Sequence, residues 1–149
     1  MHARRTAIKL ASRLHKGIYI LTRGRVLGRV ANMPVLLLTT TGRRTGRATT
    51  TPLTYLEAET GELVVVGSNG GEDSPPSWWR NLLATPEATI TIGTHAEQVV
   101  ARPATAAERE RLWPVVTGIH PGYEGYARRT SRTIPLVLLA RTKENAPGR

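Results

Sequence analysis

Short apolar runs of strand length, joined by short connections, recur along most of this sequence. The two longest strongly apolar runs, residues 35–38 and 136–140, are far below the roughly 20 residues that a membrane span needs. Short connections favour antiparallel pairing. About six strands with few free edges predict a barrel or a curled sheet, a mainly β fold with flanking helices. The expected strands are residues 34–40, 49–57, 63–66, 88–92, 98–102 and 134–140.

Helical patterns lie before and between these strands. Ser74 as N-cap and Pro75 at the first helical position predict a short helix that runs to residue 84. Thr105 and Glu108 form a capping box, which predicts a helix to about residue 116. Residues 123–131 predict another short helix. Pro52 indicates an edge or a bulge in the second strand, because proline donates no ladder hydrogen bond.

The 149 residues read as one domain with three parts. Apolar residues at three- and four-residue steps predict a basic amphipathic helix within residues 1–30. Residues 34–140 form the barrel, and residues 141–149 are a frayed tail. The N-terminal helix either packs on the domain with a solvated basic face or rests on anionic lipid.

The net charge of +10, from 21 Lys+Arg against 11 Asp+Glu, predicts an anionic partner. Nucleic acid, anionic lipid and an acidic small molecule all fit this charge. Nucleic acid is not expected, because three Trp, four Tyr and no Phe offer few platforms for base stacking. The N-terminus has no secretory signal pattern, so we expect a cytoplasmic protein, with peripheral contact at the inner face of the membrane as the alternative.

Several kinds of chemistry are excluded by the residue types. Without cysteine there is no thiol nucleophile or cysteine-ligated metal, and the four histidines show no metal-ligand spacing, so no metal site is expected. No phosphate-binding Walker loop, nucleophile elbow or dinucleotide fingerprint occurs. If the chain is an enzyme, a cofactor must perform the difficult step.

The turn at residues 41–47 (TGRRTGR) is the most informative polar segment. Its glycines allow a tight turn that exposes backbone N–H groups. Arg43, Arg44 and Arg47 can make bidentate contacts to phosphate or carboxylate. The alternative is a solvated basic hairpin.

A second polar turn, Ser68, Asn69 and Gly70, directly follows a buried strand and makes a suitable rim for a ligand. The alternative is an ordinary glycine turn. In the next helix, Trp78 and Trp79 point in different directions. One should therefore enter the core while the other lines a groove and stacks on a planar ring, unless both are structural.

Residues 120–126 (HPGYEGY) place Tyr123 and Tyr126 on one face of a helical turn. Two phenols there can orient a planar acceptor or supply a proton. Alternatively, both tyrosines pack in the core.

Five segments in this order resemble the deazaflavin-dependent nitroreductase and quinone reductase family of actinobacteria, over residues 34–140. They are residues 38–46, 67–71, 76–82, 120–126 and 132–135. The resemblance implies a split β-barrel related to the FMN-binding barrels. It also implies that reduced coenzyme F420 delivers hydride to a quinone-like or nitroaromatic acceptor. Related barrels are often dimers, which leaves a homodimer open.

The resemblance also implies roles for single residues. Arg43 and Arg44 would meet the anionic phosphate and oligoglutamate part of the coenzyme. Tyr123 and Tyr126 would face the acceptor, and either of them or His120 would supply the proton. Ser68 would contact the oxygen of the acceptor. The pocket for the coenzyme would be lined by Ser68, Asn69, Trp78 and Asn81.

Three positions depart from the pattern of that family. Asn69 stands where lysine is frequent, so we expect one weaker coenzyme contact. Ser77 stands where methionine is frequent, and His120 stands where tyrosine is found, on the acceptor side. Two alternatives remain, an FMN-dependent oxidoreductase on the same barrel and a non-catalytic protein that binds F420 or another anionic ligand.

Overall fold

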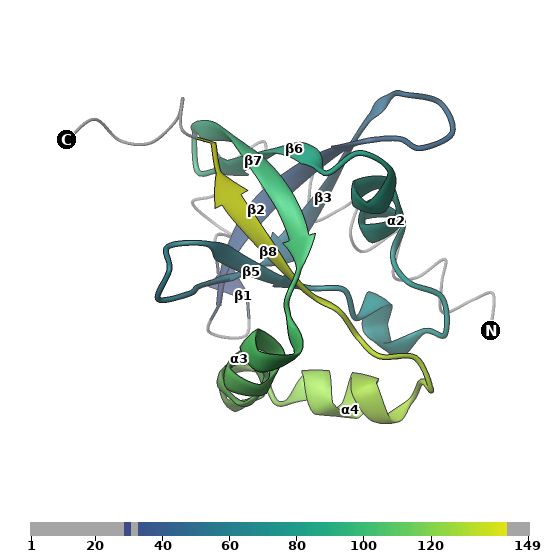
Figure 1. Ribbon diagram of the computed structural model, residues 1–149, viewed down its shortest axis with the longest axis vertical. Helices are drawn as coiled ribbons and strands as arrows, with labels where there is room; N and C mark the ends of the chain where they lie inside the picture. The colour runs from purple at the N-terminus through teal and green to yellow at the C-terminus, as the bar shows by residue number, and fades with distance from the viewer. Residues whose placement is uncertain (1–28, 31–32, 143–149) are drawn as a thin grey trace.

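The computed structural model describes residues 29–30 and 33–142, and a single sheet of eight strands forms the centre of this part of the chain (Figure 1). Every ladder in the sheet is antiparallel, as the short connections predicted. The strands are β1 (Arg29–Val30), β2 (Met33–Thr41), β3 (Ala48–Thr54), β4 (Leu56–Glu57), β5 (Leu63–Val66), β6 (Glu87–Ile92), β7 (His95–Pro103) and β8 (Leu136–Arg141).

Three α-helices and one 3-10 turn accompany these strands within the described residues. Of the predicted N-terminal segment, residues 1–28 lie outside the described part. Residues 29–30 form β1 instead, because they pair with the start of β2. Likewise Arg141 belongs to β8 rather than to a frayed tail. The helical elements are η1 (Asn69–Gly71), α2 (Ser77–Ala84), α3 (Ala106–Ile119) and α4 (Gly122–Arg128).

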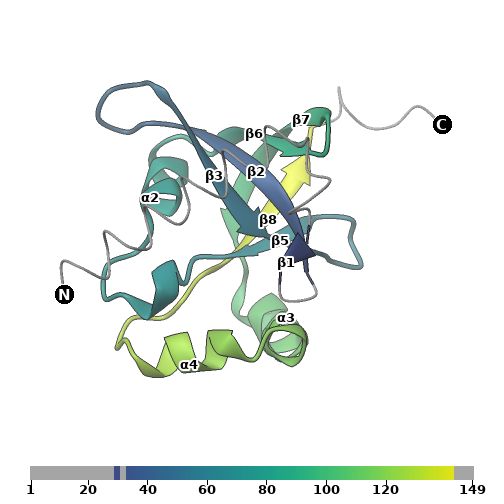
Figure 2. The ribbon, with the colours of Figure 1, turned by 180° about the vertical axis from the view of Figure 1, so that it is seen from behind.

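The order of the strands forces the sheet to curl. From β4 the ladder runs through β5, β8, β7 and β6 to β2, and β3 pairs with β2. Yet β3 and β4 are separated in the chain by Tyr55 alone. Because an extended residue spans about 3.5 Å, the two ends of the ladder must lie beside each other. The predicted barrel follows from this closure, and Figure 2 shows the same curled sheet from behind.

Strand β3 lies at an edge of the sheet, which is one of the two positions that Pro52 predicted. Within the described sheet it pairs with β2 only, and Pro52 lies opposite Leu37. The missing N–H of Pro52 therefore falls on an edge strand, where a proline is tolerated. The predicted strand over 49–57 is broken at Tyr55, whose N–H donates to the Pro34 carbonyl oxygen at 3.0 Å.

Strand β8 is buried on both faces, as a continuous apolar run predicts. Val137 and Leu139 join the core inside the barrel, whereas Leu136 and Leu138 join a second core beneath α3 and α4. Since successive side chains point to opposite faces, one strand links both cores.

The helix starts agree with prediction in one case and not in the other. At α3, Glu108 N–H donates to Thr105 Oγ1 and Thr105 N–H donates to Glu108 Oε1, so the capping box is confirmed. The predicted start of α2 is wrong, because Pro76 rather than Ser74 is the N-cap. Pro75 precedes another proline, which disfavours a helical backbone at that residue.

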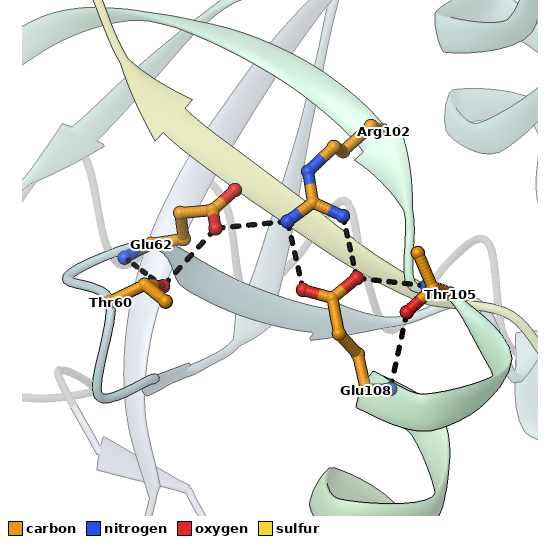
Figure 3. Close-up of polar contacts among 5 residues, drawn as sticks. All are labelled: Thr60, Glu62, Arg102, Thr105 and Glu108. Atoms are coloured by element: carbon orange, nitrogen blue, oxygen red, sulfur yellow. Dashed lines mark hydrogen bonds and ion pairs between the residues drawn. The ribbon is translucent and has the colours of Figure 1, made fainter.

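Arg102 ties the start of α3 to the barrel (Figure 3). Its two terminal nitrogens donate to the two carboxylate oxygens of Glu108 at 2.7 and 2.8 Å, and Nη2 also donates to Glu62 Oε1 at 3.0 Å. Glu62 lies between β4 and β5, so one guanidinium joins two segments of the barrel to a helix. The bonds from Arg102 and from the Thr105 backbone lower the pKa of Glu108 to about 2.

Candidate functional site

The basic turn projects from the end of the β2–β3 hairpin. Gly42 N–H donates to the Arg47 carbonyl oxygen, and Gly46 adopts a positive φ of 70°, as a tight glycine turn requires. Arg44 and Arg47 are exposed, and neither pairs with a carboxylate among the described residues. As far as the described residues show, these two guanidinium groups are thus available to an anion.

Arg43 is held differently from its two neighbours. Its backbone N–H and its Nη1 both donate to Asn81 Oδ1, at 3.2 and 3.0 Å. Asn81 is 3% exposed, and its Nδ2 donates to Thr40 Oγ1 at 3.1 Å. Both lone pairs of the amide oxygen are therefore occupied by Arg43. Asn81 fastens the basic turn to α2, and its predicted contact with a coenzyme stays a prediction.

The two tryptophans of α2 are both buried. Trp78 is 5% exposed and Trp79 is 9% exposed, and both belong to the core inside the barrel. The prediction that one of them lines a groove is wrong. Adjacent helical residues lie about 100° apart, and the apolar stripe of a helix is wide enough to bury both. A role for Trp78 beside a coenzyme stays a prediction.

The second polar turn has an unusual backbone. Asn69, Gly70 and Gly71 have positive φ values of 46°, 63° and 79° in succession. Asn69 Nδ2 donates to the Ser74 carbonyl oxygen at 3.0 Å, so this amide group holds the turn. Ser68 is nearly buried, and its hydroxyl forms no hydrogen bond with the described residues. The turn therefore presents a hydroxyl that no other described residue occupies.

Arg132 organises this turn, although in the sequence it stands out only by its place in a motif. Its Nε donates to the Glu72 carbonyl oxygen at 2.9 Å, and its Nη2 donates to those of Ser68 and Gly67 at 2.9 and 3.2 Å. Burial lowers the pKa of Arg132, and Asp73 partly opposes this shift. Carbonyl partners carry no signature in the residue types, so no sequence signal could have revealed the contact.

The three aromatic residues predicted on the acceptor side lie together. The ring centroids of His120 and Tyr123 are 4.5 Å apart, and those of Tyr123 and Tyr126 are 6.0 Å apart. Tyr123 is buried, and its hydroxyl is bonded to Thr54 Oγ1 at 2.8 Å. Burial raises the pKa of Tyr123, and the bond to Thr54 opposes that shift. Tyr126 is half-buried, with the guanidinium of Arg129 over its ring at 5.6 Å.

The second polar turn is pressed against α4. A Cβ atom added at Gly71 would lie 2.9 Å from the Tyr126 carbonyl oxygen and 3.3 Å from Arg129 Cβ. The turn that begins at Ser68 is therefore in contact with the helix that carries both tyrosines. Along one side of the barrel, Figure 1 shows the basic turn, α2, η1 and α4 in this order, and Figure 2 shows the same series. The elements that carry the predicted site residues thus follow one another along this side, from the basic turn at one end to α4 at the other.

The described residues contain no cluster of three or more potential metal ligands. None of the described helices is long and apolar enough to cross a membrane.

Residues 11–141 match the sequence profile of a family described as F420H(2)-dependent quinone reductase. The F420H(2)-dependent quinone reductase Rv1261c of Mycobacterium tuberculosis is 40% identical over 134 residues, which cover 87% of this chain and 89% of that protein.

Two solved structures have a similar fold and sequence. One is a domain-swapped dimer with a TM-score of 0.67 and 32% identity, which covers 83% of this chain and 93% of its own. The other is the F420-H2 dependent reductase FDR-A, with a TM-score of 0.64 and 33% identity, covering 71% of this chain and 93% of its own. The predicted split β-barrel with flanking helices is therefore confirmed.

Proposed function

We propose that this chain, which belongs to the F420H(2)-dependent quinone reductase family, is an oxidoreductase that uses reduced coenzyme F420 to deliver hydride to a quinone-like acceptor. The observation that carries the proposal is the contact of the Ser68 turn with α4 through Gly71. This contact brings a predicted coenzyme-binding turn and the predicted acceptor-binding tyrosines side by side.

The residues present fit an elongated anionic coenzyme. Arg44 and Arg47 offer guanidinium groups without carboxylate partners in the described residues, which suits a phosphate or a glutamate tail. The backbone at Gly70 lets a planar ring approach the chain closely, since this residue has no side chain. When bound, the reduced coenzyme would supply the hydride.

The chain itself would bind the coenzyme and the acceptor, orient them toward each other and protonate the acceptor. A quinone that accepts hydride needs one further proton to become a quinol. Tyr126 is the better candidate donor, because the hydroxyl of Tyr123 is already bonded to Thr54. His120, whose ring is tilted against that of Tyr123, is the alternative donor. The free hydroxyl of Ser68 can donate to the oxygen of the acceptor, where negative charge develops.

Four finer points belong to the same proposal. Nitroaromatic compounds are a second class of acceptor, since a flat electron-poor ring suits the aromatic face of α4. A homodimer is supported by the related domain-swapped dimer. The proposal places the protein in the cytoplasm, and peripheral contact with anionic membrane is supported by the basic residues before residue 30.

The test is an anaerobic mixture of purified protein, reduced coenzyme F420 and a soluble menaquinone analogue. The absorbance of the oxidised coenzyme should return far faster than in a control without protein. No turnover, together with no change in coenzyme fluorescence on titration, would contradict the proposal. A yellow protein that retains FMN would favour the flavin alternative. Tight coenzyme binding without turnover on any acceptor would favour a non-catalytic binder.

A further inference from the structure

We infer that Arg132 is a positioning residue of this reductase. Its guanidinium holds the Ser68 turn in the shape that receives the coenzyme and seats this turn against the segment that carries the acceptor-binding tyrosines. The inference rests on the proposed function, because the role of the turn comes from there. Arg132 itself is not assigned a contact with coenzyme or acceptor.

Three backbone carbonyl groups of one turn converge on this guanidinium. The carbonyl oxygens of Gly67, Ser68 and Glu72 all accept from Arg132, which lies 60 to 65 residues further along the chain. Carbonyl dipoles that point at the same place repel one another, and a cation between them removes the repulsion. The positive charge therefore stabilises a backbone arrangement that the turn would not favour alone.

Bonds within the turn also act on its backbone. Gly71 N–H donates to the Ser68 carbonyl oxygen and Glu72 N–H donates to that of Asn69. Asn69 is a non-glycine residue in the left-handed region, a conformation that costs energy and persists only where its surroundings impose it. Arg132 supplies three of the contacts that impose it.

Arg132 also sets where the turn sits. Gly67 N–H donates to the Pro135 carbonyl oxygen at 2.9 Å, and a Cβ atom at Gly67 would lie 2.7 Å from Pro135 Cγ. At its other end, Gly71 packs on the backbone of Tyr126. Both ends of the turn thus pack on the continuous segment 122–135. Arg132, which belongs to the same segment, hydrogen-bonds to the turn between these two contacts. Loss of this arginine should displace Ser68 relative to Tyr126 while both cores remain intact.

The chain offers a matched control in Arg109. This arginine also donates to a backbone carbonyl, that of Ile134, and covers the ring of Trp113 at 4.7 Å. It is partly buried like Arg132, and burial lowers the pKa of both side chains. It does not contact the Ser68 turn. The variant Arg109→Gln therefore removes a guanidinium–carbonyl bond near the same segment and leaves the turn in place.

The experiment compares Arg132→Gln, Arg132→Lys and Arg109→Gln with the wild type. Hydrogen–deuterium exchange over residues 67–72 is measured without coenzyme, and coenzyme affinity is measured by fluorescence titration. In Arg132→Gln we expect exchange at Gly71 and Glu72 to accelerate and affinity to fall about tenfold. Turnover with the menaquinone analogue should fall about 100-fold, because reacting groups are misplaced. Arg132→Lys should recover part of each effect, and Arg109→Gln should lose thermal stability without these effects.

Two results would overturn the inference. One is unchanged exchange over residues 67–72 in Arg132→Gln, and the other is an equal loss of affinity in Arg109→Gln. Failure of the proposed function looks different. A wild type that binds coenzyme and reduces no acceptor, with exchange and affinity responding as expected in the variants, would contradict the proposed reaction and keep Arg132 as a positioning residue for the coenzyme. A wild type that binds no coenzyme would overturn both.

Discussion

The hydroxyl of Tyr123 is hydrogen-bonded to Thr54 Oγ1 at 2.8 Å, which joins α4 to the end of β3. The phenol of Tyr126, three residues later, is not tied in this way within the described residues. Two tyrosines that look equivalent in the sequence therefore have different surroundings, and their substitutions should have different consequences.

Tyr126→Phe should slow turnover about 100-fold, as expected for the loss of a proton donor, and leave thermal stability unchanged. Tyr123→Phe should lower the free energy of unfolding by about 1 kcal/mol, because Thr54 loses a buried partner, with a smaller effect on turnover. Coenzyme affinity should survive in both variants. Steady-state kinetics and thermal melts check this, and equal losses of turnover in the two variants would contradict the assignment.

Asn81→Ala should weaken coenzyme binding through Arg43. The substitution removes the acceptor for two Arg43 hydrogen bonds and the donor to Thr40, so we also expect about 1–3 kcal/mol less unfolding free energy. Thr40→Val is the control, because it breaks the bond to Thr40 and keeps those to Arg43. Fluorescence titration should show weaker binding in Asn81→Ala alone. An equal loss in Thr40→Val would mean that general stability, not the basic turn, sets the affinity.

Replacing Arg44 and Arg47 together by Gln should lower coenzyme affinity about tenfold at low salt, since each guanidinium offers charge-assisted bonds to an anion. The effect should shrink as salt screens the remaining attraction. Stability should change by less than about 0.5 kcal/mol, because both side chains are exposed. Arg111→Gln, an exposed arginine on α3, is the charge-matched control for one substitution. If the single substitution Arg111→Gln lowered coenzyme affinity as much as each substitution in the basic turn does, the overall electrostatic field of the protein, and not the basic turn, would explain the loss.

Features fixed by neighbouring residues could be predicted from the sequence. The capping box at Thr105 and Glu108 depends on two residues three positions apart, and it forms as predicted. Residues 136–139 are buried on both faces because their apolar run is continuous. Pro75 was misassigned because the proline after it, and not its own preference, decides its backbone.

Contacts between distant segments could not be predicted. Asn81 meets Arg43 across 38 residues, and Arg132 meets the Ser68 turn across more than 60. Arg132 meets only backbone carbonyl groups, and Asn81 accepts from the backbone as well as from the side chain of Arg43, so residue types carry little record of either pairing. The burial of both Trp78 and Trp79 also depends on how closely α2 packs on the barrel, which a single helix does not reveal.

Glu108→Gln should destabilise the protein at neutral pH and lose this effect in acid. The folded-state pKa of Glu108 is about 2, below its ordinary value of 4.5. Its carboxylate therefore contributes stability above about pH 4.5, and the contribution is lost as the pH falls toward 2. Because the side chain of Arg102 is 42% exposed, salt should weaken the effect.

The measurement for Glu108 is the melting temperature of wild type and Glu108→Gln from pH 7 down to pH 3, at low and high salt. The difference between them should be largest at pH 7 and narrow below about pH 4.5. Glu110→Gln, an exposed glutamate on the same helix, should melt close to the wild type throughout. A difference that persists undiminished at pH 3 would show that the packing of the glutamate side chain, and not its charge beside Arg102, anchors α3 to the barrel.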